Sequence, residues 1–399
     1  MIEDIKKIIP RDNIRYVVLM SILWAPVLLG YMRGIVNHIP ILGLFTDELE
    51  VLFVLFFIIV NLNTIVKHIK YSDLVFLVVI FISYILNFLL FPENGLQLEK
   101  HFFSTLFLVV PYYLYGRCIN VEKYDDLFYV LSIICICLDT FYFLYYGQLT
   151  KAEDELLEEG GYSMNAAYKL LPYVLFVIWR LYRKPTLIGG ALSFLGVFLL
   201  LSYGTRGPIV CLLSFVVVYF LFFIKSKHAK TIKTILVLSV LALSKIFNEL
   251  MLLTQGLLIE LGMSSRIFDK YLSGDITEDS GREDFITTPL LNILNGSDSF
   301  WGHGYFGSYN VVGTYPHNII IEFMFTFGKL FGLLLLFMLA ILIFKALINR
   351  SSLVEKSFFV LLICTSIIKL LMTGTFLDDA FFFFMIGYGV QLLKRIELA

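Results

Sequence analysis

Residues 280–332 read SGREDFITTPLLNILNGSDSFWGHGYFGSYNVVGTYPHNIIIEFMFTFGKLFG, and this stretch decides how the rest of the chain is interpreted. It is the longest run that cannot span a membrane along most of its length. It ends in Pro316-His317-Asn318 at the start of an apolar run. Almost everything outside it is apolar sequence with short polar connections. We therefore look for function where this loop meets the bilayer.

The composition indicates a polytopic, all-α membrane protein. Of the 399 residues, 59% are hydrophobic and only 16% are charged, whereas charged residues make up about 25% of soluble domains. The net charge of -1 comes without a basic patch interleaved with aromatics, so no nucleic-acid partner is expected. The 5 cysteines lie within or at the ends of apolar runs and lack metal-ligand spacing, which predicts small buried side chains.

A bilayer core of about 30 Å needs about 20 apolar residues per helix. On this basis the sequence predicts about 12 transmembrane helices, with one large extracytoplasmic loop before the last three. The predicted spans are 16–31, 51–64, 74–91, 102–115, 128–146, 166–179, 187–202, 209–224, 234–248, 319–344, 358–372 and 376–392. We expect one membrane domain in three parts: nine spans in 1–249, the loop in 250–316 and three spans in 317–399.

The distribution of positive charge predicts the orientation. Most of the 31 Lys and Arg residues fall in connections on the side of the N-terminus. The positive-inside rule then places both termini in the cytoplasm and the 250–316 loop outside. The first apolar run is expected to remain as a span, because no small-x-small cleavage pattern follows it.

A tight turn, Tyr203-Gly204-Thr205-Arg206-Gly207-Pro208, separates two predicted spans on the outer side. Thr205 is a candidate N-cap, with Pro208 in the first turn of the following helix. Arg206 then lies at a helix N-terminus, where unpaired amides favour an anion and a guanidinium can bind phosphate oxygens bidentately. The alternative is an arginine that snorkels to lipid headgroups.

Ser280-Gly281-Arg282-Glu283 fits the capping-box pattern and predicts a helix start. Arg282 would lie in the first turn, again beside unpaired amides. Pro289 should kink this helix or begin a second one after Thr288. A solvated loop arginine is the alternative for Arg282.

Downstream, Gly302-His303-Gly304 forms a glycine turn flanked by aromatic residues. Such a turn lets the backbone come close to a ligand or lie at the membrane interface. His303 fits a surface histidine as well as a site residue.

His317 is the candidate general base. In the first turn of a helix, the positive end of the dipole favours neutral imidazole, the form that a base requires. The alternative is an interfacial histidine that anchors a span. The run after Asn318 is longer than one crossing, so Gly328-Lys329 predicts a break. Glu322 lies one turn beyond Asn318, and His317 and Asn318 would then face a cavity instead of lipid.

The order of these elements resembles the O-antigen ligase and polymerase superfamily of membrane glycosyltransferases. The resemblance covers about Leu200 to Gly332 and rests on short motifs: Thr205-Arg206-Gly207, Gly281-Arg282, the turn from Gly302 to Gly304, and His317-Asn318 followed by Gly328 and Gly332. It implies a multi-pass protein of the bacterial inner membrane that acts on an undecaprenyl-pyrophosphate-linked oligosaccharide.

The resemblance also implies site roles. His317 would take the proton from the acceptor hydroxyl. Arg206 and Arg282, with Arg266 as a third candidate, would bind the pyrophosphate in place of a metal, so no metal and no cofactor is expected. The expected supporting residues are Asn318, Glu322, Gly302 and Gly304.

Polymerase is the preferred activity, with another lipid-linked repeat unit of an O-antigen or capsular polysaccharide as acceptor. Ligation of glycan to the lipid A core of lipopolysaccharide is the alternative. In either case the lipid bilayer is the environment, and a chain-length regulator and a flippase of the same pathway are candidate partners.

Other features keep different mechanisms open. The acidic segments 47–50 and 153–159 are candidates for Mg²⁺ or Mn²⁺ binding, against solvated loops, and Asp378-Asp379 reads first as the polar cap of the last hairpin. Asp139 and Lys369 are charges within apolar runs that should pair or line a path. A transporter or lipid-linked oligosaccharide flippase is the non-enzyme alternative, although the chain shows no repeat of related halves.

Overall fold

The computed structural model describes residues 58–59, 62–63, 65–153, 164–203, 205–223, 252, 255–256, 260, 283–296 and 300–394. Every regular element in these ranges is a helix, which confirms the predicted all-α class. The chain divides into two compact units, which are described separately.

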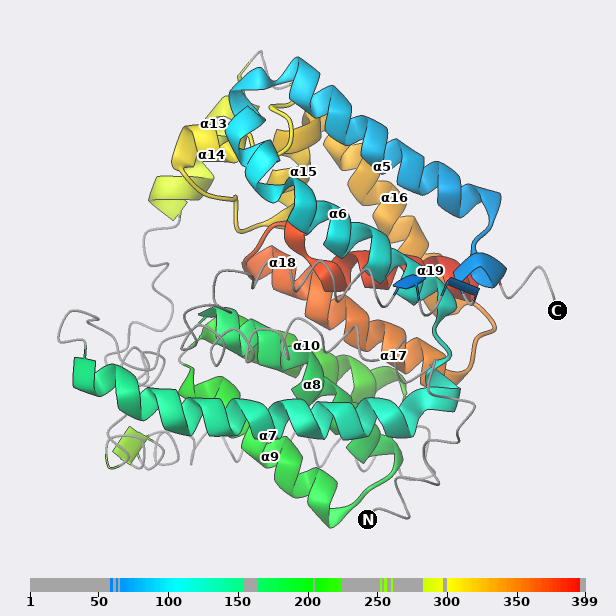
Figure 1. Cartoon of the computed structure of the whole chain (residues 1–399), viewed down its shortest axis with the longest axis vertical. Coiled ribbons are helices and arrows are strands. Elements are labelled where there is room, and N and C mark those ends of the chain that lie inside the picture. The colour runs from blue at the N-terminus through cyan, green and yellow to red at the C-terminus, as the bar shows by residue number, and fades with distance from the viewer. Residues whose placement is uncertain are drawn as a thin grey trace. The chain divides into compact units, whose positions relative to one another are not determined.

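The first unit joins the segment before residue 124 to the C-terminal part of the chain (Figure 1). Its N-terminal elements are α5 (Tyr71–Leu90), η3 (Pro92–Asn94) and α6 (Gly95–Cys118). Its C-terminal elements are η4 (Glu283–Thr287), α13 (Thr288–Leu294), α14 (Ser308–Val312), α15 (Ile319–Phe327), α16 (Lys329–Ile348), α17 (Leu353–Ile363), η6 (Cys364–Ile368), α18 (Lys369–Met372), η7 (Phe376–Asp378) and α19 (Ala380–Lys394). Segments far apart in sequence therefore share one packed body.

Two helices of this unit, α5 and α16, are long and apolar enough to cross a membrane. Each has 20 residues, with a mean hydropathy of 2.5 for α5 and 2.8 for α16, and only 11% of each apolar window is buried. The core helix of a soluble protein would instead be mostly buried. These surfaces suit contact with lipid and agree with a helical membrane protein, while the number of about 12 spans stays a prediction.

The predicted break at Gly328-Lys329 is confirmed. α15 ends at Phe327, Gly328 has a φ of 86°, and α16 begins at Lys329. At 1.5 Å per residue α15 is only about 14 Å long, too short to cross a bilayer. Of these two helices only α16 is long enough to cross a bilayer, so α15 is not part of the membrane-spanning helix.

Other boundaries differ from the expectation. α7 (Val121–Glu153) continues through residues 147–153, where a connection was expected, so Glu153 belongs to a helix end. The rest of the acidic segment, and the acidic segment 47–50, lie outside the described residues.

Four of the five cysteines are buried as predicted, but Cys137 is exposed.

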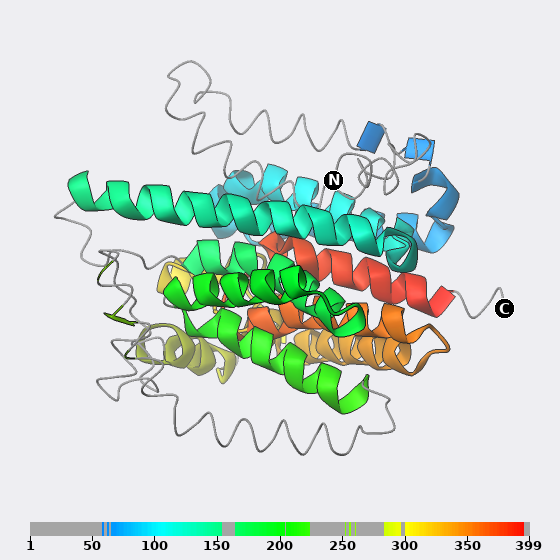
Figure 2. The ribbon, with the colours of Figure 1, turned by 90° about the horizontal axis from the view of Figure 1, so that it is seen from below.

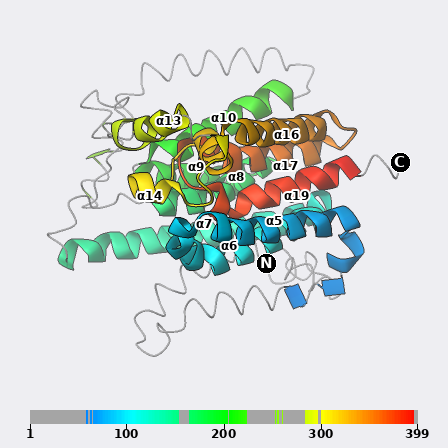
Figure 3. The ribbon, with the colours of Figure 1, turned by 90° about the horizontal axis from the view of Figure 1, so that it is seen from above.

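α6 and α19 pack against each other with their backbones in contact at Gly116 and Gly387, and both helices can be found in Figure 1 and Figure 3. A Cβ added to Gly116 would overlap the carbonyl oxygen of Phe384, and one added to Gly387 would overlap that of Tyr113. Small residues let helix backbones approach this closely, and the gain is van der Waals contact over the whole crossing.

A buried ion pair joins α5 to α6. Arg117 donates to both oxygens of Asp73, from Nε at 2.8 Å and from Nη2 at 3.1 Å, and the Tyr113 hydroxyl donates to Asp73 at 2.7 Å. Asp73 and Arg117 are almost fully buried. A buried charge requires such a complete set of partners, because desolvation otherwise outweighs the attraction.

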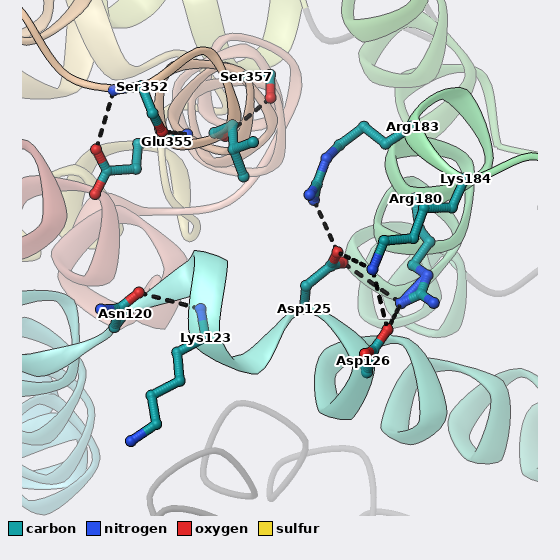
Figure 4. A network of polar contacts seen from close by, with 11 residues as sticks. Asn120, Lys123, Asp125, Asp126, Arg180, Arg183, Lys184, Ser352, Glu355 and Ser357 are labelled. Atoms are coloured by element: carbon teal, nitrogen blue, oxygen red, sulfur yellow. Dashed lines mark hydrogen bonds and ion pairs between the residues drawn. The ribbon is translucent and has the colours of Figure 1, made fainter. Parts of the chain in front are cut away.

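The second unit contains α7, α8 (Met164–Arg183), α9 (Leu187–Ser202) and α10 (Arg206–Phe222), seen beside one another in Figure 2. Charged side chains join the start of α7 to the end of α8 (Figure 4). Asp125 pairs with Arg183 at 3.1 Å and with Lys184 at 3.4 Å, and Asp126 pairs with Arg180. Burial opposes ionisation of Asp126, but Arg180 and Lys184 outweigh it and lower the pKa of this carboxyl.

The α6–α19 contact predicts that Gly387→Ala destabilises the protein. The added methyl has no room against the Tyr113 carbonyl, and overpacking of this kind typically costs about 1–3 kcal/mol. Thermal unfolding of the detergent-purified protein measures it. Gly190→Ala in α9 is the matched control, because nothing lies within 4 Å of the added carbon there. A Gly387→Ala protein that melts with the parent contradicts the packing described here.

Candidate functional site

The site is built around the start of α15. Asn318 is the N-cap, and its side-chain oxygen accepts from the amides of Ile320 at 2.9 Å and Ile321 at 3.5 Å. His317 therefore lies one residue before the N-cap, not in the first turn as expected. The residue still directly precedes the N-cap, at the positive end of α15.

His317 is held in an unusual backbone conformation. Its φ is 56°, in the left-handed region that non-glycine residues seldom occupy. Its ring lies 4.3 Å from that of Tyr315, and its Nδ1 is 3.1 Å from the Thr373 hydroxyl oxygen. When Nδ1 carries the proton and donates to Thr373, Nε2 is the basic nitrogen. These contacts fix the ring of the predicted base.

The partner of His317 belongs to the segment Thr373-Gly374-Thr375-Phe376-Leu377-Asp378-Asp379, which separates α18 from α19 and contains only the short 3-10 helix η7. Glu322 of α15 accepts from this segment through both carboxyl oxygens, from the hydroxyl of Thr375 and from the amide of Phe376 at 3.2 Å. Burial raises the pKa of Glu322 to about 8, against the lowering effect of these two bonds. Glu322 therefore fastens the segment to the helix that follows His317.

The other charges of the segment are also paired. Lys369, at the start of α18, lies 2.6 Å from Asp379, whose side chain is 2% exposed. Pairing was one of the two expectations for Lys369, and the structure confirms it. The partner, Asp379, was interpreted first as part of the polar cap of the last hairpin. Asp378 contacts His101 of α6. The neighbourhood of His317 thus carries more carboxylates than permanent cations.

The glycine turn supports the site from the other side. His303 donates its amide to the Phe325 carbonyl at 2.8 Å, and Gly304 donates to that of Thr326 at 3.0 Å. Gly302 has a φ of 76°, and a Cβ there would overlap the backbone of Gly328. The turn thus fixes the break between α15 and α16, where Gly302 lies against backbone and Gly304 lies against the side chains of Phe91 and Asn87.

The same turn is anchored to the N-terminal elements of this unit. Asn87 of α5 accepts from the Tyr305 amide at 2.6 Å, and Asn94 of η3 donates to the His303 carbonyl at 2.8 Å. The His303 ring stacks on Phe325. This part of the large loop is a structural connection between α5, η3 and α15.

The structure brings together part of the predicted site. His317, Asn318, Glu322, Gly302 and Gly304 lie in or against α15 within one unit. Arg206 is the first residue of α10 in the other unit. Thr205 is the N-cap there as predicted, but its side chain makes no capping bond. Arg266 and Arg282 lie outside the described residues.

The comparisons with known proteins leave the family open. No protein-family model, no curated protein and no solved structure matches the chain. The resemblance therefore rests on the residues quoted above. Within the described residues, no three His, Cys, Asp or Glu side chains are grouped so that they could hold one metal ion.

The sequence analysis missed the 373–379 segment and His101. A signal for the segment was present, because a Thr-Gly-Thr followed by two aspartates interrupts two apolar runs. Non-helical backbone at membrane depth has to face protein or water. His101 gave no signal, because its partner lies far away in the sequence.

The burial of Glu322 predicts a pH-dependent stability. The folded protein keeps the proton up to about pH 8, whereas the unfolded chain releases it near the ordinary value of 4.5. Between these values the unfolded state binds fewer protons, so stability falls as pH rises. We expect Glu322→Gln to remove this component of the decline between pH 5 and pH 8, measured by thermal unfolding.

Glu322→Ala is the companion variant, because it leaves the Phe376 amide without its acceptor. We expect it to lose about 1–3 kcal/mol at pH 6, where Glu322→Gln stays close to the parent. An unchanged pH profile in Glu322→Gln contradicts the assignment.

Proposed function

We propose that this chain is a membrane glycosyltransferase of the O-antigen polymerase type, acting in the bacterial inner membrane with both termini cytoplasmic. It would transfer glycan from undecaprenyl pyrophosphate to a hydroxyl of another lipid-linked repeat unit. The observation that carries the proposal is the constrained His317, held by Tyr315 and Thr373 beside the N-terminus of α15. A base needs such a fixed ring with one nitrogen committed to a partner.

The proposed chemistry follows from this arrangement. Nε2 of His317 takes the proton of the acceptor hydroxyl as its oxygen attacks the sugar C1. The bond from C1 to the pyrophosphate oxygen breaks, and undecaprenyl pyrophosphate leaves with the bonding electrons. Fixed positive charge would stabilise that leaving group in the transition state. We assign this charge to Arg206, Arg282 and Arg266.

The acidic surroundings of His317 favour a site in which different groups bind the acceptor sugar and the pyrophosphate. The carboxylates of Asp378 and Asp379 in this neighbourhood would repel a pyrophosphate, whereas carboxylates hydrogen-bond well to sugar hydroxyls. The His317 neighbourhood therefore suits the acceptor side of the reaction. The phosphate side requires cations from elsewhere in the chain, which the candidate arginines would provide.

His317→Ala tests the base. A positioned base contributes about 10²–10⁴-fold to a rate, so this variant should lose chain extension by that factor while remaining in the membrane. The assay uses the purified protein in proteoliposomes with lipid-linked repeat units and measures glycan length. His68→Ala, at an exposed histidine outside the site, is the control. Extension at the parental rate by His317→Ala would show that the base is another group.

The same assay with EDTA tests the proposed use of arginines instead of a metal. We expect chain extension to be unchanged by the chelator. If extension stops and returns with added Mg²⁺ or Mn²⁺, the acidic segments 47–50 and 153–159 become the candidates for a metal site. Parental protein that moves lipid-linked units across the bilayer without lengthening them supports the transporter alternative.

A deletion strain separates polymerase from ligase. Loss of a polymerase leaves single repeat units on the lipid A core. Loss of a ligase leaves long chains on the carrier lipid. We expect the first pattern.

A further inference from the structure

A second histidine in the same unit is held by a carboxylate. The Nδ1 atom of His101, on α6, lies 3.0 Å from Oδ2 of Asp378 in η7. Both side chains remain partly accessible, at 21% for His101 and 26% for Asp378. With Nδ1 donating to Asp378, Nε2 becomes the acceptor nitrogen, in an orientation fixed by a third group. The catalytic role proposed for His317 leaves this pair unexplained.

Aromatic residues of the large loop hold the His101 ring in place. Phe306 stacks on it, with ring centroids 4.7 Å apart and planes at 23°, and Tyr309 lies 6.4 Å away. Phe306 is buried and has a φ of 60°. In the described part of the chain, the non-glycine residues with positive φ are Phe306 and His317. Backbone strain of this kind persists only where the surroundings enforce it, and it concentrates at functional sites.

Tyr309 links the His101 pair to the surroundings of His317. Tyr309, in α14, is half-buried, and burial together with the charges of Asp378, Tyr315 and Glu322 raises its pKa to about 12. Tyr309 also lies next to the His101 ring, and the 373–379 segment contacts both histidines, His317 through Thr373 and His101 through Asp378. The two histidines belong to one polar neighbourhood made by α6, α14, α15 and η7.

The chemistry of this neighbourhood selects its ligand. The carboxylates of Asp378 and Asp379 disfavour a phosphate. Half-buried Tyr309 and Tyr315 present ring surface next to hydrogen-bonding groups. Polar groups that donate and accept beside an aromatic surface match a neutral sugar, which carries hydroxyls on its edge and C–H groups on its faces.

We propose that His101, Asp378 and Tyr309 form a subsite that binds the hydroxyl groups of the acceptor glycan; this inference rests on the proposed function. His101 and Asp378 act by positioning the acceptor, while His317 takes the proton. A purely structural pair that joins α6 to η7 is the competing explanation. The two explanations differ in the binding of glycan.

His101→Asn is the discriminating variant. Its amide nitrogen can still donate to Asp378 in place of Nδ1, but it has no counterpart of Nε2. A hydrogen bond between neutral groups is worth about 0.5–1.5 kcal/mol, so we expect the KM for the acceptor repeat unit to rise about two- to tenfold, with kcat changed much less. Asp378→Asn should act in the same direction. His317→Ala should instead lower kcat.

A binding measurement makes the test independent of turnover. The probe is the repeat-unit oligosaccharide, released from its carrier lipid and fluorescently labelled, and its anisotropy is followed with the His317→Ala protein in lipid nanodiscs. Adding His101→Asn should weaken binding about two- to tenfold. Tyr309→Phe, which removes only a hydroxyl, should weaken it by a smaller factor and serves if His101→Asn fails to fold. Asp126→Asn, in the ion-paired cluster of the other unit, is the matched control.

The outcomes are distinct. Unchanged binding and KM in the His101 and Tyr309 variants, with or without a lower melting temperature, overturn the subsite in favour of a structural pair. Displacement of the oligosaccharide by inorganic pyrophosphate overturns the assignment of a neutral ligand. Parental protein that binds the oligosaccharide through His101 without extending chains refutes the glycosyltransferase and supports the subsite. Parental protein that binds no oligosaccharide refutes the subsite.

Discussion

A segment that interrupts the α-helices of an apolar chain needs hydrogen-bond partners for its backbone N–H and C=O groups, because lipid provides none. The 373–379 segment meets this constraint through Glu322. One carboxyl oxygen accepts from the Thr375 hydroxyl and the other from the Phe376 amide. A buried carboxyl is expensive in free energy unless it is bonded in this way. The position of η7, and with it those of Asp378 and Asp379, follows from this contact.

The same rule governs the other buried charges. Asp73 is surrounded by Arg117 and Tyr113, Asp379 is paired with Lys369, and Asp139 on α7 accepts from the Tyr203 hydroxyl at 2.8 Å. Each joins two different segments of the chain. A charged side chain in an apolar segment therefore links two segments, and the position of its hydrogen-bonding or ion-pairing partner determines which segments pack together. Apolar side chains alone fix such pairings less specifically.

Close backbone packing supplies the remaining specificity. Gly116 and Gly387 bring α6 against α19, and Gly302 meets Gly328 where the large loop crosses the end of α15. His101 of α6 is thereby in the same body as the loop residues Phe306 and Tyr309 and the last hairpin. The proposed acceptor site thus combines residues from α6, from the large loop, from the start of α15 and from the 373–379 segment, all within one unit. Its strained residues, His317 and Phe306, lie on the loop that these contacts hold.

The sequence by itself determined the all-helical class, the apolar composition expected of a membrane protein and the break at Gly328. These depend on local properties: apolar run length and glycine conformation. It also indicated His317, because a Pro-His-Asn before an apolar run is a local pattern. Only the tertiary structure decided that Glu322 fastens the 373–379 segment, that Lys369 pairs with Asp379 and that His101 pairs with Asp378. These contacts join residues from different elements, two of them far apart in the chain, and their energies depend on burial and on partners that local sequence does not specify.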